Sequence, residues 1–122
     1  MIDIGEARVL VVEDDSLVAM MVEDMLADIG CGTVTVADSL AAALSEATTG
    51  SFDFAVLDVN IAGEEVFPVA DALKARGVPF AFASGYGAMG VPERYRDAAI
   101  AAKPFRIDEL EAVVLAGLAQ RS

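Results

Sequence analysis

The chain has 122 residues, 56% of them hydrophobic, and its 8 basic and 20 acidic residues give a net charge of −12. This size predicts one domain over residues 1–122, with a substantial core and no separate output domain. The hydrophobic fraction excludes intrinsic disorder, and the negative charge argues against direct binding to nucleic acid.

Membrane and histidine-based functions are also disfavoured. No uncharged apolar run reaches the ~18 residues that a membrane span requires, and the N-terminus has no basic region followed by an apolar one, so neither membrane insertion nor an export signal is expected. The single Cys31 cannot form an internal disulfide, and the absence of histidine argues against zinc sites and histidine-dependent catalysis. A reducing cytoplasm fits these features.

In chain order, five β-rich apolar segments are predicted as strands, at residues 8–12, 33–36, 54–60, 79–83 and 100–102. A helix begins after the first strand, capped by Asp15 or Ser16 and ended by Gly30. Its inward face is predicted to hold Val18, Met21, Val22, Met25, Leu26 and Ile29.

Helical segments follow the other strands as well. The second helix is predicted after a cap at Asp38 or Ser39, running through about Ala47. The third strand is followed by a loop through Gly63 and a helix over about 65–76 with Pro68 in its first turn. Residues 91–98 allow only a short helix, and Asp108 with Glu111 predicts a capping box at the start of the last one. This fivefold strand–helix alternation predicts an α/β fold, a (βα)5 three-layer sandwich with a parallel sheet covered on both faces.

Polar groups stand at the ends of four predicted strands. Glu13 and Asp14 follow the first strand, Asp58 ends the apolar run of the third, Ser84 follows the fourth and Lys103 the fifth. The carboxyl ends of parallel strands meet at one edge of an open sheet, where ligands bind. Converging acids, one hydroxyl and one ammonium group predict a site for Mg²⁺ and a phosphoryl group.

The same residues resemble the receiver domain of two-component response regulators. The resemblance runs from about Arg8 to Leu118 and rests on four motifs in order: Val-Leu-Val-Val-Glu-Asp-Asp, Leu-Asp-Val-Asn, Ala-Ser-Gly and Lys-Pro-Phe. It implies a flavodoxin-like sheet of order 2-1-3-4-5. Residues 79–87, Pro-Phe-Ala-Phe-Ala-Ser-Gly-Tyr-Gly, look like the signature of a stand-alone subgroup with Phe-Ala-Thr-Gly-Tyr, which is associated with histidine kinases of the HWE type.

The resemblance implies a role for each site residue. Asp58 would be the phospho-acceptor that attacks a phosphohistidine on a sensor histidine kinase or a histidine phosphotransfer protein. Glu13, Asp14, Asp58 and the backbone carbonyl of Asn60 would bind Mg²⁺, which prefers oxygen ligands. Ser84 and Lys103 would each contact a phosphoryl oxygen. The simpler interpretations are a cluster of acids at a helix N-terminus, a solvated acid at a strand end and a serine in a turn.

One position departs from the family. Most receivers have tyrosine or phenylalanine three residues before the lysine, and this chain has Ile100. The hypothesis is that ordering of residues 84–98, with or without movement of Tyr86, carries the signal; the alternative is that Tyr86 only covers the edge of the site.

Three function classes follow. The first is a non-enzymatic phosphorelay module that shuttles phosphate, acts as a phosphate sink or regulates by contact. The second is a small aspartyl-nucleophile phosphohydrolase, although the second acid that such enzymes place two residues after the nucleophile is Asn60 here. The third is a pseudo-receiver that binds partners without phosphorylation.

The last helix, with Val113 and Leu115, is either a docking or homodimer face or an ordinary core helix.

Overall fold

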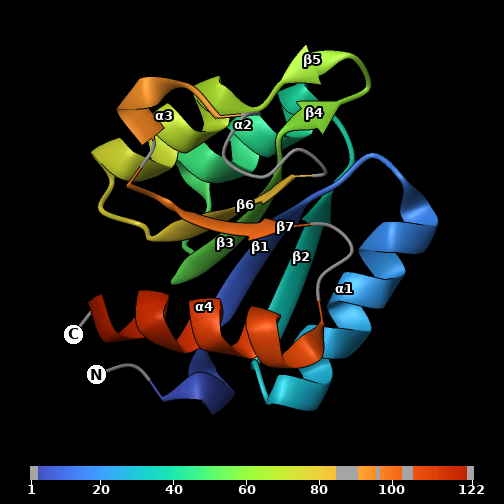
Figure 1. Ribbon diagram of the computed structural model, residues 1–122, viewed down its shortest axis with the longest axis vertical. Helices are drawn as coiled ribbons and strands as arrows, with labels where there is room; N and C mark the ends of the chain where they lie inside the picture. Colours follow the sequence, from blue (N-terminus) through green and yellow to red (C-terminus); the bar gives the residue numbers. More distant parts are fainter. Residues whose placement is uncertain (1–2, 85–90, 96, 103–105, 121–122) are drawn as a thin grey trace.

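A five-stranded sheet forms the middle of the fold in a computed structural model that describes residues 3–84, 91–95, 97–102 and 106–120 (Figure 1). The strands lie in the order β2-β1-β3-β6-β7, and all neighbouring pairs are parallel. Their bounds are β1 (Arg8–Val12), β2 (Thr33–Ala37), β3 (Phe54–Asp58), β6 (Phe80–Ser84) and β7 (Ala99–Ala102). The α/β class and the flavodoxin-like order 2-1-3-4-5 are therefore confirmed.

Helices cover both faces of this sheet (Figure 1). On one face lie α1 (Ser16–Ile29) and α4 (Ile107–Gln120), and on the other α2 (Leu40–Thr49) and α3 (Phe67–Ala75). A short 3-10 helix, η1 (Ile4–Glu6), precedes β1. Within the described ranges, no helix is long and apolar enough to cross a membrane.

The apolar strands serve two separate cores. Val9 and Val11 pack with residues of α1 and α4, whereas Leu10 and Val12 pack with residues of α2 and α3. Successive side chains of a strand point to opposite faces, so a strand with helices on both sides is apolar at every position except its ends. This explains why β1 and β3 are runs without hydrophobic–polar alternation.

Side-chain hydrogen bonds cap the N-termini of α1 and α2. The Asp15 carboxylate accepts hydrogen bonds from the N–H groups of Leu17 and Val18 at 3.0 and 3.3 Å. The Ser39 hydroxyl accepts from the N–H of Ala42 at 3.1 Å. Asp15 is thus the cap of α1, Ser39 that of α2, and Gly30 ends α1 at a φ of 109°.

The predicted inward position of Met21 is wrong. Its side chain is 52% exposed, and Met20 and Leu17 are 59% and 66% exposed, whereas Val22 and Leu26 are buried. One residue along a helix turns the side chain by about 100°. Met21 therefore cannot share the centre of the buried face with Val22, and it belongs to an apolar stripe on the outside of α1.

The start of α4 differs from the predicted capping box at Asp108 and Glu111. The helix begins at Ile107, and Glu109 accepts a hydrogen bond from the N–H of Arg106 at 3.3 Å. An acid that reaches back from the third helical residue to the residue before the helix is one half of a capping box. The device is present, two residues earlier than predicted.

A two-stranded hairpin replaces the loop predicted after β3. Its strands are β4 (Asn60–Ile61) and β5 (Glu64–Glu65), paired antiparallel. The two turn residues, Ala62 and Gly63, have φ values of 51° and 86°. Positive φ at both central positions gives a turn whose twist matches a hairpin, but the usual sequence for it is Asn-Gly or Asp-Gly. Alanine in this conformation is the reason that sequence patterns did not predict the hairpin.

The fourth connection carries only one helical turn among its described residues. Within 91–95 and 97–98, where a short helix was predicted, only η3 (Glu93–Tyr95) is helical, as a 3-10 turn. Tyr95 on this turn is buried, and its ring packs with three phenylalanine rings at centroid distances of 5.5–6.2 Å. These rings are Phe67 of α3 and Phe80 and Phe82 of β6. The turn is therefore held by aromatic packing as well as by its 3-10 hydrogen bonds.

The phenol of Tyr95 is hydrogen-bonded to the carboxylate of Asp71 on α3. Burial and this bond together raise the pKa of Tyr95 to about 12. The bond from Tyr95 is in turn the largest cause that lowers the pKa of Asp71, with Arg94 and Lys74 adding to it and burial opposing it. The folded state thus favours a neutral phenol beside an ionised carboxylate.

These shifts predict a loss of stability at high pH. Above a pH of about 10 the unfolded chain releases the phenolic proton while the folded chain retains it up to about 12, so unfolding becomes more favourable across this window. We expect the free energy of unfolding, measured with urea, to fall between pH 9 and pH 11.5 by about 2 kcal/mol more in the wild type than in Tyr95→Phe. The variant has no phenolic proton to release at this position. Equal losses in the two proteins would contradict the prediction.

Candidate functional site

Three strands end in polar residues at one edge of the sheet. The register pairs Val12 of β1 with Leu57 of β3, and Asp58 of β3 with Ala83 of β6. Glu13 follows β1 directly, and Ser84 is the last residue of β6. The parallel register therefore brings these residues to the same edge, as the sequence predicted.

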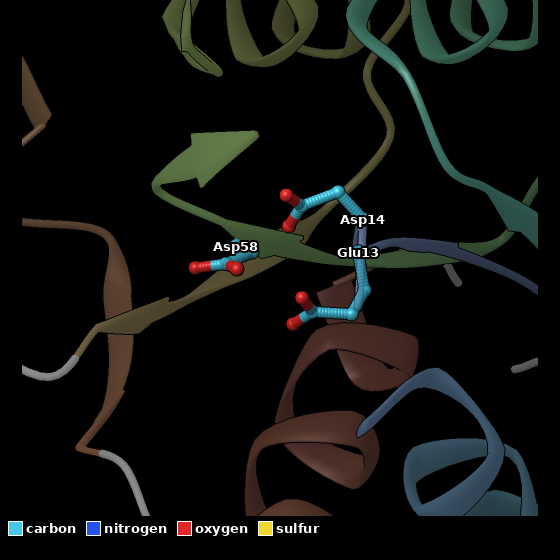
Figure 2. Close-up of side chains that lie close together, drawn as sticks. All are labelled: Glu13, Asp14 and Asp58. Atoms are coloured by element: carbon cyan, nitrogen blue, oxygen red, sulfur yellow. The ribbon is translucent and has the colours of Figure 1, made fainter. Parts of the chain in front are cut away.

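The carboxylates of Glu13, Asp14 and Asp58 form a cluster in which the three ligand oxygens lie within 4.8 Å of one another. Figure 2 shows the side chains of Glu13 and Asp14, from the loop after β1, with their carboxylates turned toward the side on which Asp58 lies. Glu13 is buried, Asp58 is half-buried and Asp14 is exposed. The cluster thus lies at the boundary between the core and solvent, open to an incoming group.

Backbone donors position two of these carboxylates. Glu13 accepts a hydrogen bond from the N–H of Asp15 at 3.1 Å, and its own N–H donates to the carbonyl of Ala37 at 3.1 Å. Asp14 accepts from the N–H of Ala62, 48 residues away in the chain, at 3.0 Å. Hydrogen bonds to a charged acceptor are stronger than neutral ones and offset part of the mutual repulsion of the acids.

Ala62 is the positioning residue that the sequence analysis missed. Its N–H contacts Asp14 from the tip of the β4–β5 hairpin, so the hairpin fixes the carboxylate that it faces. The nearest sequence signal was Gly63, which marks a turn but does not indicate where the turn points. The contact depends on the positive φ of Ala62, and a residue pattern does not encode that value.

For the other predicted site residues, the structure gives the positions of Ser84 and Asn60 but does not describe Lys103. Ser84 is 3% exposed, one residue beyond the partner of Asp58 in the register. Asn60 follows Asp58 by two residues, and its side-chain oxygen accepts from the N–H of Gly63 at 3.0 Å, so a metal contact of Asn60 falls to its backbone carbonyl and stays a prediction. Lys103 and Tyr86 lie outside the described residues, although β7 ends at Ala102, directly before Lys103.

Comparison with known proteins gives one family. The family described as "Response regulator receiver domain" matches residues 9–115. The chain belongs to the response regulator receiver family. Among curated proteins, none matches this receiver domain.

Two solved structures are similar to this chain over nearly its whole length. The solution structure of SdrG from Sphingomonas melonis Fr1 has 42% sequence identity and a TM-score of 0.80, over 94% of this chain and 98% of that chain. The BeF3-activated conformation of SdrG from Pseudomonas melonis Fr1 has 42% identity and a TM-score of 0.76, over 97% and 98% of the two chains.

A more distant structure holds a metal. The receiver domain of the sensor histidine kinase PA1611 from Pseudomonas aeruginosa PAO1, with a magnesium ion coordinated in its active site cleft, has 20% identity and a TM-score of 0.77, over 93% and 98% of the chains. At this identity the likeness shows the fold alone.

The donor set of the cluster fits a hard divalent cation. Its three groups are all carboxylates, without imidazole or thiolate, and carboxylate oxygens with retained water are what Mg²⁺ prefers. A cation between them would also relieve the repulsion of like charges, which nearby hydrogen bonds only partly offset. The arrangement therefore suits metal-assisted chemistry on an anionic group.

The cluster predicts that Mg²⁺ stabilises the receiver domain. At a concentration about tenfold above the dissociation constant, binding to the folded state adds about 1.4 kcal/mol, which raises Tm by roughly 3–6 °C for a chain of this size. Differential scanning fluorimetry with and without MgCl₂ measures this shift. Asp14→Asn should lose the shift, whereas Asp24→Asn, an exposed acid on α1 away from the cluster, should retain it. An equal shift in both variants would contradict the assignment.

Proposed function

We propose that this receiver domain accepts a phosphoryl group on Asp58 from a phosphohistidine of a sensor histidine kinase or a histidine phosphotransfer protein. The supporting observation is the convergence of Glu13, Asp14 and Asp58 at the carboxyl edge of the sheet, with oxygens within 4.8 Å of one another. Mg²⁺ would be held by these carboxylates and the backbone carbonyl of Asn60, and it would neutralise charge on the phosphoryl oxygens. The two-component family to which the chain belongs supports the same reaction class.

The roles of the chain's own groups follow from their positions. A carboxylate oxygen of Asp58 would attack the phosphorus, the P–N bond to the donor histidine would break, and an aspartyl phosphate would form. The buried Ser84 hydroxyl would donate to one phosphoryl oxygen, and Lys103 would pair with another. Catalysis of this kind depends on positioning and charge neutralisation, so the chain needs no general base.

A phosphohydrolase is the less favoured function. Such an enzyme needs a second acid two residues after the nucleophile, and Asn60 is an amide whose oxygen already accepts from Gly63. An amide cannot donate or take up the proton that a general acid or base transfers. We therefore infer a signalling module rather than an enzyme with its own turnover.

The donor protein is proposed to dock on the outer stripe of α1, formed by Leu17, Met20 and Met21. These three large apolar side chains are 52–66% exposed and adjoin one another at helical spacing, in the helix that begins directly after Glu13 and Asp14. The stripe lies near the start of the helix that follows two of the site carboxylates, and a contiguous exposed apolar patch can mark a contact site. The stand-alone subgroup, an HWE-type kinase as donor and the cytoplasm as the place of action are part of this proposal, and they rest on the resemblance of residues 79–87 to the signature of that subgroup.

Intact-mass spectrometry after incubation with acetyl phosphate tests the proposed chemistry. The wild type should gain one phosphoryl group only when Mg²⁺ is present, because the acids repel the anion without it. Asp58→Asn should gain none, whereas Asp38→Asn, an exposed acid that also follows a strand at this edge, should react as the wild type does. Unchanged labelling of Asp58→Asn would refute the assignment.

Phosphotransfer from a phosphorylated histidine kinase tests the docking stripe. Replacing Leu17 and Met20 by alanine should slow this transfer about tenfold, since fully burying a side chain of this size contributes about 1.5–3 kcal/mol. Labelling by acetyl phosphate should stay unchanged, because a small donor needs no docking surface. The comparison variant is Leu115→Ala on α4, a side chain that is 48% exposed on the alternative docking helix and should slow neither reaction if the donor uses the α1 stripe. Equal slowing by the comparison variant would refute the stripe.

A further inference from the structure

The aromatic residue that most receivers carry at position 100 is replaced by isoleucine, and a different aromatic residue is built into the same region. Ile100 packs, half-buried, against the core on the α2–α3 face. Tyr95, five residues earlier on η3, belongs to that same core and is 4% exposed. Its ring stacks on Phe67 and meets Phe82 edge-on, with centroids 5.5 Å apart in the second pair. Tyr95 is therefore an aromatic residue of this part of the core, packed beside the first half of β6.

Two adjacent residues fasten η3 to α3 through one carboxylate. The phenol of Tyr95 donates to one oxygen of Asp71, and the guanidinium of Arg94 lies 3.4 Å from the other. The same guanidinium lies over the Tyr95 ring, 5.1 Å from its centre, and the ammonium of Lys74 lies 5.6 Å from that ring. The carboxylate of Asp71 thus contacts the side chains of both Arg94 and Tyr95.

The position of this fastening allows it to be released. The side chains of Arg94 and Asp71 are 57% and 54% exposed, so water can replace their ion pair at little cost. Only the bond from the buried Tyr95 phenol gains from exclusion of water. A half-exposed contact such as this one can open and close more readily than a contact buried in the core.

Tyr95 is linked to the proposed phosphorylation site through strand β6. It packs on Phe82, which lies beside Leu57 in the register, and Leu57 directly precedes Asp58. Phe82 is two residues before Ser84 on the same strand, and the chain runs from Ser84 to η3. Any shift of Ser84 toward a phosphoryl group therefore acts on the strand whose ring supports Tyr95.

We propose that the Tyr95–Asp71 hydrogen bond is a latch that holds η3 against α3 in the unphosphorylated protein and is released on phosphorylation of Asp58. The proposal rests on the proposed function of Asp58 and names how that site is regulated. The latch takes the part of the missing aromatic switch at position 100. By linkage, if phosphorylation favours release, then loss of the latch favours the phosphorylated state by the same factor.

Affinity for beryllofluoride, used as a mimic of the phosphoryl group in the presence of Mg²⁺, tests the latch. Tyr95→Phe keeps the ring and removes the hydroxyl, and Asp71→Asn removes the charged acceptor. Each should tighten binding by about 3- to 10-fold, the coupling expected of one hydrogen bond to a charged group. The double variant should bind no more tightly than the single ones, because both act on the same bond. Asp97→Asn, an exposed acid beyond the same turn, serves as the control and should bind as the wild type does.

A direct readout comes from amide hydrogen exchange of the wild type. The N–H of Tyr95 donates to the carbonyl of Pro92 at 2.9 Å, and its protection should fall when the mimic binds. Unchanged protection together with unchanged affinity in Tyr95→Phe and Asp71→Asn would overturn the latch while leaving the phospho-acceptor role intact. If the wild type does not bind the mimic, or binds it equally well without Asp58, both the proposed function and the latch are overturned.

Discussion

The mutual repulsion of three carboxylates held at one edge of a parallel sheet is the constraint on which this structure depends. Glu13, Asp14 and Asp58 would separate if they stood on mobile loops, since like charges in a partly buried setting repel strongly. They stay together because β1 and β3 are buried on both faces and paired in a fixed register. The stability of the two cores thus holds the acids in a charged arrangement that a cation can use.

The parts of the fold that follow from residue periodicity could be predicted from the sequence. Apolar runs ending in acids indicated the strands and the edge where Glu13, Asp14 and Asp58 meet, and the strand order came from the resemblance to receivers. Met21 was misplaced because two consecutive helical residues cannot both lie at the centre of a buried face. The contact of Ala62 with Asp14 depends on a backbone angle, and the pairing of Tyr95 with Asp71 depends on tertiary packing, so local patterns indicated neither.

The two faces of the sheet differ in how they are built. Among the described residues, the α1–α4 face is packed with aliphatic side chains and one phenylalanine, and the other face gathers a cluster of aromatic rings around Tyr95 of η3. Aromatic rings with offset or edge-on contacts fix orientation as well as area. The short 3-10 turn η3 is anchored here by these rings and by Asp71, so contacts on the α2–α3 face fix its position.

The division of each central strand between two cores has a consequence for variation in chain length. Deleting Ala55 from β3 would move the residues that follow it to the opposite face, so that Leu57 would leave the α2–α3 core and Asp58 would turn away from Glu13. Insertions at the tip of the β4–β5 hairpin, or before β2, leave that frame intact. Because side chains alternate between the two cores along each strand, a change of one residue in strand length disrupts both cores. Natural changes in length should therefore be confined to the connections between the strands.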